Sequence, residues 1–409
     1  MISEVSAMLM QFRVKNYRSI GDEVIIDLVA GGGRELPDFP IEIKKGVKLL
    51  PVISIYGSNA AGKSNIIEAM FHMFRNITYS HRYDKREDML TVPFMYDEKL
   101  RSEPTEFEIF IALDGVEYQY GFTSTLREVH EEWLYKRTLS AKKDTISKLI
   151  FERKGDEIKL SDDYRKFKSL MDIVGEQNLF LSFLGAQKSK TAKAFVDMRS
   201  WVGGIFNIYT DWRNFDAWAK IYKDDSYLKE SFVSFIREFD PCIEGIEIED
   251  DDEINKDGET GYRVLTRHNG KPYPMIFESE GTRRLFSLYA VIHTCLKEWT
   301  SLFVCDELDA HLHPLVLRRI VGMFHDKEVN KMGSQLIFSS HNLIVLDNKE
   351  LRRDEIVFIE KDERGFTTAY ALDSFKTSEE AVRSDLNYGK HYLAGRFGAI
   401  PYANISEDI

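Results

Sequence analysis

Residues 57–64, GSNAAGKS, constrain the fold of this chain more than any other feature of its sequence. They fit the pattern G-x-x-x-x-G-K-[ST], with an apolar run at 49–55 before them and a run of helical periodicity after them. A strand, a glycine loop and a helix in this order predict a phosphate-binding loop. Lys63 would reach the outer phosphates of a nucleotide, and the Ser64 hydroxyl would bind magnesium. The predicted nucleotide-binding residues are Gly57, Ser58, Asn59, Ala60, Ala61, Gly62, Lys63, Ser64 and Asn65.

An acidic strand end far downstream supplies a second half for such a site. The apolar residues 302–305 run into Asp306 and Glu307. A carboxylate at the tip of a strand can hold magnesium, and its neighbour can polarise an attacking water. We therefore predict Asp306 and Ser64 as metal ligands and Glu307 as a catalytic residue. The alternative, a strand that merely ends in surface acids, is weakened by the presence of the loop.

Two further segments could contact phosphate. Ser279 begins a small polar turn before a helix, and it is either a simple N-cap or part of a second phosphate-binding surface. His341 follows another short apolar strand, at 335–338. We predict that Ser279 and Gly281 bind nucleotide and that His341 contacts the γ-phosphate. One nucleotide hardly needs two helix N-termini from a single subunit.

Composition limits the class of protein. The 409 residues carry 55 Lys and Arg against 67 Asp and Glu, a net charge of −12, which argues against a surface coated for nucleic acid. Three dispersed cysteines give no case for a zinc site or a disulfide framework. The first residues lack a signal-peptide pattern, and the apolar runs are too short to span a bilayer. We expect a cytoplasmic protein with no membrane partner.

The pattern of elements predicts an α/β fold with three parts. Residues 1–160 would form a first lobe with the phosphate loop and an antiparallel β part, which includes a hairpin at Asp114 and Gly115. Residues 161–245 would form an inserted helical subdomain, and residues 246–409 a second lobe. No sustained heptad pattern is present between Lys63 and Ser279, so we expect no long coiled coil.

These motifs, in this order, resemble those of the ABC-type ATPases. The loop resembles their Walker A motif, SEGT their signature, LFVCDE their Walker B motif and His341 their switch histidine. The resemblance implies a P-loop ATPase head that uses ATP and Mg2+. It also implies a homodimer in which two subunits sandwich two ATP molecules, each signature contacting the nucleotide on the other subunit's loop. Assembly into a higher oligomer stays open.

Within that class, NYRSIGDEVIIDL near the start and DELDAHLHP after the acidic strand resemble the SMC, RecF and OLD branch. They are most similar to the bacterial AAA15/21-type ATPases that include RloA and the AbiL ATPase component. Two positions depart from the ABC pattern: Glu280 replaces the second signature glycine, and His313 replaces the aspartate expected after Walker B. The Q-loop glutamine could be Gln177 or Gln187.

The resemblance implies two functions from different classes. The first is a sensor or regulatory subunit of an antiphage defence or toxin–antitoxin system, which controls a separate effector protein such as a nuclease or toxin. Only 68 residues follow His341 (409 minus 341), too few for a nuclease domain. The alternative is a DNA-binding repair ATPase similar to RecF. Its candidate contacts to nucleic acid are Lys188, Lys190, Lys193, Arg318, Arg319, Arg352 and Arg353.

Overall fold

The computed structural model describes residues 7–33, 35–84, 88–140, 146–187, 190–208, 215–254, 260–297, 302–374 and 387–401. Its central layer is a six-stranded sheet in the order β11-β15-β16-β5-β17-β18. All neighbours in this sheet are parallel except β17 and β18, which pair antiparallel. The strands are β5 (Val52–Gly57), β11 (Phe206–Ile208), β15 (Leu302–Cys305), β16 (Gln335–Ser339), β17 (Ile356–Lys361) and β18 (Thr367–Ala371).

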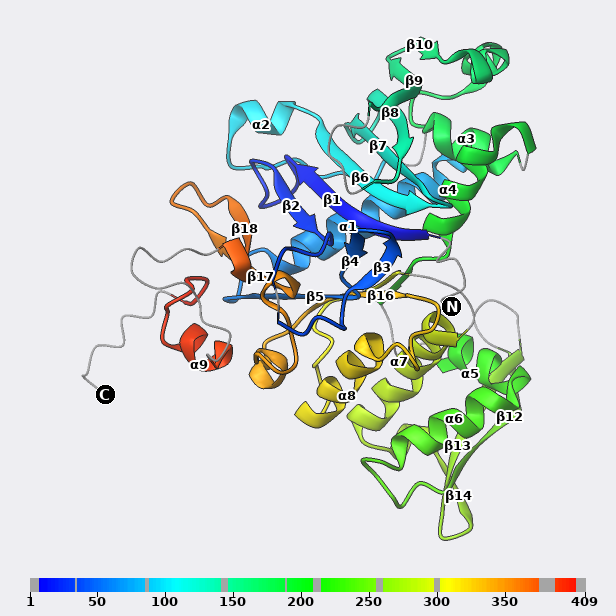
Figure 1. Ribbon diagram of the computed structural model, residues 1–409. Helices are drawn as coiled ribbons and strands as arrows, with labels where there is room; N and C mark the ends of the chain where they lie inside the picture. The colour runs from blue at the N-terminus through cyan, green and yellow to red at the C-terminus, as the bar shows by residue number, and fades with distance from the viewer. Residues whose placement is uncertain are drawn as a thin grey trace.

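The central sheet is covered on both faces, as the unbroken burial of β5, β15 and β16 requires. Alternate residues of one strand enter different hydrophobic clusters: Ile53 and Ile55 belong to one cluster, and Val52 and Tyr56 to the other. The sheet is thus the middle of three layers, with one core on each side. Figure 1 shows β5 and β16 between an upper group of elements and a lower one.

The first face is covered by α1 (Lys63–Tyr79) and a seven-stranded sheet. The predicted apolar face of α1 is present, with Ile67, Met70, Phe74 and Ile77 buried and Phe71 partly buried. The seven-stranded sheet is antiparallel throughout, in the order β10-β9-β8-β7-β6-β1-β2. Its strands are β1 (Ala7–Lys15), β2 (Val24–Asp27), β6 (Thr105–Leu113), β7 (Val116–Ser124), β8 (Val129–Thr138), β9 (Lys148–Lys154) and β10 (Glu157–Leu160).

The predicted hairpin lies between β6 and β7. Asp114 and Gly115 form its two-residue turn, and both have positive φ, 49° and 75°. This geometry suits the right-handed twist of the flanking strands, which explains the strong signal of the Asp-Gly pair. A separate small hairpin, β3 (Ile41–Lys44) and β4 (Val47–Leu49), lies beside β1.

The helical region predicted at 161–245 is divided between the two cores. A 3-10 segment (Asp162–Ile173), α3 (Phe180–Ala186) and α4 (Lys193–Gly203) pack with α1 on the first face. After β11, α5 (Phe215–Asp224) and α6 (Ser226–Ile236) pack against α7 (Glu280–Lys297) on the second face. The expectation of one inserted helical subdomain therefore differs from the packing found here. The periodicity of the sequence identifies the apolar face of each helix, but it does not show which of the two cores that face packs into.

The second face is built from α7 (Glu280–Lys297) and α8 (Pro314–His325), with a three-stranded sheet beyond them. That sheet consists of β12 (Gly245–Ile254), β13 (Thr260–His268) and β14 (Lys271–Pro274). Short α2 (Glu98–Ser102) and α9 (Tyr388–Leu393) lie at the periphery (Figure 1). The longest helix in the described ranges, α7, has 18 residues, so the α/β fold without a long coiled coil is confirmed. No helix in those ranges combines the length and apolarity needed to cross a membrane.

Candidate functional site

The predicted site residues follow three neighbouring strands. β15, β16 and β5 are parallel neighbours in the central sheet, so their carboxyl ends meet at one edge. The phosphate loop follows β5, Asp306 and Glu307 follow β15, and Ser340 and His341 follow β16. Ligands of parallel α/β sheets bind at this edge. The fold thus brings the segments that the sequence predicted for a nucleotide site to neighbouring positions.

The loop itself has the geometry of an anion cradle. Gly62, immediately before α1, has φ 116°, which only glycine adopts readily. A Cβ on Gly57 would lie 2.3 Å from the Ile359 carbonyl oxygen, so β17 also requires glycine there. The Lys63 ammonium donates to the carbonyl oxygens of Gly57 at 2.8 Å and Ser58 at 3.1 Å.

A chain of hydroxyl groups that the sequence did not reveal supports the loop. The Asn65 amide donates to Ser19 Oγ at 2.6 Å, and Ser19 Oγ lies 2.7 Å from Thr367 Oγ1. Thr367 in turn donates to the Ala61 carbonyl at 2.8 Å. Ser19 lies between β1 and β2, and Thr367 begins β18. Segments that are far apart in the sequence therefore meet at the loop. No sequence motif marks either residue, because only the fold places them there.

Ser339 fixes the acidic tip of β15. Its hydroxyl donates to Asp306 Oδ1, and the Glu307 N–H donates to the same hydroxyl at 2.8 Å. Asp306 is half-buried, whereas Glu307 is exposed and has a positive φ of 47°. Such a φ is uncommon outside glycine and is held only by specific contacts. The magnesium-ligand candidate is therefore anchored, and the catalytic candidate projects toward solvent.

The Lys63 charge in the loop interacts with the carboxylates at the end of β15. Burial lowers the pKa of Lys63, and the carboxylates of Asp306, Glu307 and Asp309 oppose this shift. Lys63 is only 6% exposed, and these nearby negative charges favour its ammonium form. The same carboxylates would repel a bound triphosphate without a cation between them, which is the electrostatic setting that magnesium suits.

Asp309 was also missed by the sequence analysis. One of its oxygens accepts from the His341 backbone N–H at 3.3 Å, and the other is buried with no hydrogen-bond partner among the described residues. The Asp309 charge contributes, after burial, to raising the pKa of Tyr56. Asp309 thus holds the backbone of the loop that carries His341, whose side chain is exposed. The sequence places Asp309 three residues after Asp306, in DELD, but this spacing does not indicate what Asp309 does.

The predicted signature turn lies beside the loop that follows β15. Ser279 caps α7 by accepting from the Thr282 N–H at 3.1 Å, and it is exposed. A Cβ on Gly281 would lie 2.6 Å from the His311 carbonyl oxygen, so these two segments are in close contact. Glu280, the departure from the signature pattern, lies 3.3 Å from His311 Nδ1. The carboxylate at position 280 thus has a local partner.

The other candidate residues are placed away from this edge. Gln177 contacts the Leu126 carbonyl, near the turn between β7 and β8, and Gln187 is exposed at the end of α3. Gln177 precedes α3 and Gln187 follows it, and α3 contacts the 3-10 turn Ser80–Arg82 that follows α1. This is the opposite end of α1 from Lys63, and the helix is about 25 Å long. Neither position supports a Q-loop role. His313 caps α8 by accepting from the Leu315 N–H, whereas His311 lies beside Glu280. The two histidines therefore have different partners.

Most of the basic residues proposed for nucleic acid are paired with carboxylates. Lys188 lies outside the described residues, and Lys190 is exposed. The ion pairs are Lys193 with Asp197, Arg318 with Glu350, Arg319 with Glu238, Arg352 with Asp354, and Arg353 with Glu35. Arg352 is also fully buried, so it cannot contact a phosphate backbone without unfolding its surroundings. Five of the described members of this set are thus paired with carboxylates, which argues against a basic groove built from them.

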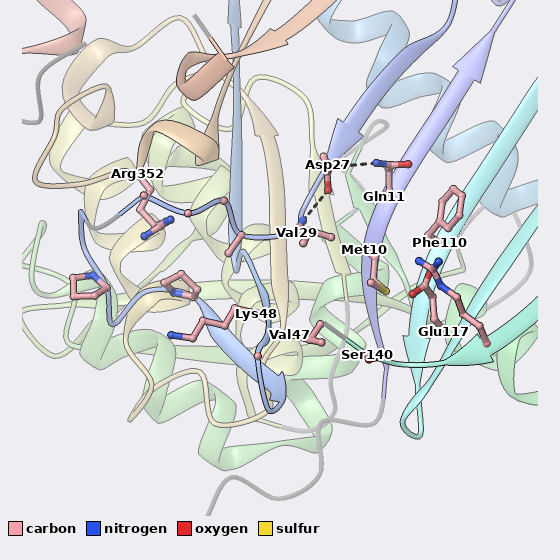
Figure 2. Close-up of a pocket in the computed structure, with 18 of the residues that line it drawn as sticks. Met10, Gln11, Asp27, Val29, Val47, Lys48, Phe110, Glu117, Ser140 and Arg352 are labelled. Carbon is pink, nitrogen blue, oxygen red and sulfur yellow. Dashed lines mark hydrogen bonds and ion pairs between the residues drawn. The ribbon is translucent and has the colours of Figure 1, made fainter. Parts of the chain in front are cut away.

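A cavity of about 620 Å³ lies elsewhere, between β1, β2 and the β3–β4 hairpin. Figure 2 shows Met10, Val47 and Phe110 lining it, with charged side chains around them. Asp27 accepts from Gln11 at 3.2 Å, and Glu117 pairs with Arg137 at 2.6 Å. None of its lining residues belongs to the loop or the acidic strand end, so this cavity is separate from the predicted nucleotide-binding residues.

The residues at the sheet edge fit a triphosphate with magnesium. Ser64 is exposed at the start of α1, and Asp306 supplies a carboxylate at the tip of β15. Hydroxyl and carboxylate oxygens are ligands that Mg2+ prefers. A Cβ on Gly57 would clash with the Ile359 carbonyl and one on Gly62 with the Thr367 side chain, so the close packing of the loop requires glycine at both positions.

Comparison with known proteins gives a family and a set of distant structural likenesses. No curated protein matches this chain. Among solved structures, the SMC head domain from Thermotoga maritima matches with TM-score 0.42 and 16% identity, covering 89% of this chain and 98% of that one. An SMC head domain bound to the C-terminal domain of ScpA derived from Pyrococcus furiosus matches with TM-score 0.40 and 13% identity, covering 89% and 96%. The model of one family matches residues 52–347, well over half of the chain, and this range includes the loop, the signature turn, the acidic strand end and His341. The chain therefore belongs to the family described as "AAA domain, putative AbiEii toxin, Type IV TA system".

Proposed function

We propose that this protein binds ATP with Mg2+ at the edge of its central sheet and hydrolyses it. The observation that carries this is the convergence of the loop, the acidic tip of β15 and the His341 loop on three adjacent parallel strands. Lys63 and the N–H groups of the loop would bind the β- and γ-phosphates. Magnesium, held by Ser64 and Asp306, would neutralise phosphate charge.

The remaining roles follow from exposure and position. Glu307 projects from an anchored backbone into solvent, where it would accept a proton from the attacking water. His341 is exposed on a loop held by Asp309, and it would donate a hydrogen bond to the γ-phosphate. The exposed Ser279 and the half-buried Gly281 would contact the nucleotide of a second copy. Ile276 and Phe277, 66% and 80% exposed directly before this turn, are apolar surface suited to such a contact.

We further propose that the ATPase is the sensor or regulatory subunit of an antiphage defence or toxin–antitoxin system, acting on a separate effector. The family description supports the toxin–antitoxin context, and the motifs resemble those of RloA and the AbiL ATPase component. The RecF-like alternative loses support, because its candidate arginines are paired with carboxylates.

Hydrolysis is tested with purified wild type, Glu307→Gln and the matched control Glu328→Gln, whose carboxylate is exposed and lies away from the sheet edge. Removal of a general base typically costs 10²- to 10⁴-fold in rate, so Glu307→Gln should bind ATP but turn it over at least about 100-fold more slowly. The control should match wild type. Normal ATP turnover in Glu307→Gln would show that Glu307 is not the general base.

The regulatory role is tested by affinity purification in the presence of the product of the neighbouring gene. Glu307→Gln, arrested with ATP bound, should accumulate as a dimer and retain the effector more strongly than wild type. ATP-dependent, salt-sensitive binding of DNA, with no protein partner recovered, would favour the repair alternative.

A further inference from the structure

Arg284 is a buried cation that none of the roles above uses. It lies in the second turn of α7 and is 6% exposed. Its Nη2 donates to the carbonyl oxygen of Glu307 at 2.6 Å. The thiol of Cys305, at the end of β15, also contacts the Arg284 guanidinium. The 2.6 Å hydrogen bond of Arg284 thus goes to the backbone of the proposed catalytic residue.

Stability alone gives a poor account of this arginine. Burying a guanidinium is costly unless carboxylates or several hydrogen bonds compensate for lost water. Across the ranges that the structure describes, the buried Nε of Arg284 has no hydrogen-bond partner. An apolar side chain of similar volume would serve packing as well. The hydrogen bond to the Glu307 carbonyl is what the buried charge provides.

The Glu307 backbone needs such a contact. Its φ of 47° is unfavourable for a residue with a side chain, and two groups hold it from opposite sides. Ser339 accepts from its N–H, and Arg284 donates to its carbonyl. Ser339 belongs to the central sheet, whereas Arg284 belongs to the helix that starts at the signature turn. The orientation of the Glu307 side chain thus depends on both elements.

We propose that Arg284 is a positioning residue for Glu307, which links the orientation of this carboxylate to the position of the first turns of α7. Ser279 caps that helix, and Arg284 follows about one turn after the cap. A contact that shifts the signature turn would be transmitted through Arg284 to the Glu307 peptide. This inference rests on the proposed ATP hydrolysis, and it adds a device by which the signature turn controls the rate.

The test compares Arg284→Met, which removes the donor, with Arg284→Lys, which keeps a charged donor. Arg319→Met, an exposed arginine of α8, is the control for loss of an arginine in the same lobe. Misplacement of a catalytic group by about 1 Å can cost around 100-fold in rate. Arg284→Met should therefore lower kcat about 10- to 100-fold, with KM and ATP affinity within about twofold of wild type. Arg284→Lys should recover at least about tenfold over Arg284→Met.

A double-mutant cycle with Glu307→Gln separates positioning from general destabilisation. If Arg284 acts through Glu307, adding Arg284→Met to Glu307→Gln should change the residual single-turnover rate by less than about threefold. A purely structural defect would lower the rate by a similar factor in both backgrounds.

Three results would overturn the inference: wild-type kcat in Arg284→Met, a loss of ATP affinity in both Arg284 variants that matches the loss of kcat, or equal effects of Arg284→Met with and without Glu307. Each leaves ATP hydrolysis by the wild type intact. Failure of the proposed function would instead appear as a wild-type protein that binds ATP and does not hydrolyse it.

Discussion

Thr367 tests whether the phosphate loop depends on side chains from the far end of the chain. Its hydroxyl donates to the Ala61 carbonyl at 2.8 Å and lies 2.7 Å from Ser19 Oγ, and the residue is 1% exposed. Thr367→Val keeps the shape of the side chain and the backbone hydrogen bond from the Thr367 N–H to the Ser19 carbonyl. It removes only the hydroxyl, so any effect reports on these two hydrogen bonds.

The expected magnitude follows from those two bonds. Each contributes a net of about 0.5–1.5 kcal/mol, and the buried Ala61 carbonyl is left without this donor. The substitution should therefore lower the free energy of unfolding by about 1–3 kcal/mol. If 1–2 kcal/mol of this is the cost of re-ordering the loop on binding, ATP affinity falls about 5- to 30-fold.

Urea-induced unfolding and equilibrium binding of a fluorescent ATP analogue measure the two effects. Thr368→Val is the matched control: this neighbouring threonine is only half-buried, and its hydroxyl donates to the Glu360 carbonyl at 3.3 Å instead of to the loop. The control should retain ATP affinity. An affinity change below twofold in Thr367→Val, or an equal change in Thr368→Val, would refute the argument that this hydroxyl pre-organises the loop.

Substitutions at three other positions have predicted effects that can be measured. Ser339→Ala removes the acceptor for the Glu307 N–H, so kcat should fall about 10- to 100-fold while ATP still binds; an unchanged kcat in a steady-state assay would contradict this. Gly281→Ala would place a Cβ 2.6 Å from the His311 carbonyl oxygen, so light scattering should show weaker ATP-dependent dimerisation at unchanged ATP affinity. Burial and two nearby arginines lower the pKa of His72 from 6.5 to about 4. The unfolded chain therefore binds more protons between these values, and stability should decrease by about 3 kcal/mol as pH falls from 6.5 to 4. His72→Gln should flatten this part of the stability curve; an unaltered slope would exclude His72 as its source.

The positions of the main site residues could be predicted because they follow from strand direction. Asp306 and His341 each follow a short apolar run, and parallel strands place such positions at one edge whatever their exact order. The hairpin at Asp114 and Gly115 was predictable for a local reason, since both residues tolerate positive φ.

The supporting residues could not be predicted, because their roles depend on long-range contacts. A serine or threonine hydroxyl has no spacing that marks it as a partner of a distant loop, as Ser19 and Thr367 illustrate. The same holds for Arg284, whose sequence neighbourhood suggested only a polar turn before a helix. The sequence pattern likewise predicted a helical region at 161–245, yet amphipathic periodicity carries no information on which face of the central sheet α4 and α6 each cover.

The order of strands implies that the complete motif at 57–64 is insufficient for ATP binding. β5 pairs with β16 and β17, both from the last quarter of the chain, and the Gln335 side chain bonds to Leu9 and Leu50 at the junction of the two sheets. Until these strands are synthesised, β5 is an apolar strand with two unpaired edges, which favours aggregation. A fragment of residues 1–300 should therefore fail to bind ATP and should aggregate, although it contains the whole loop and the signature turn. ATP binding by a soluble, monomeric fragment of this length would show that the loop forms without its neighbouring strands.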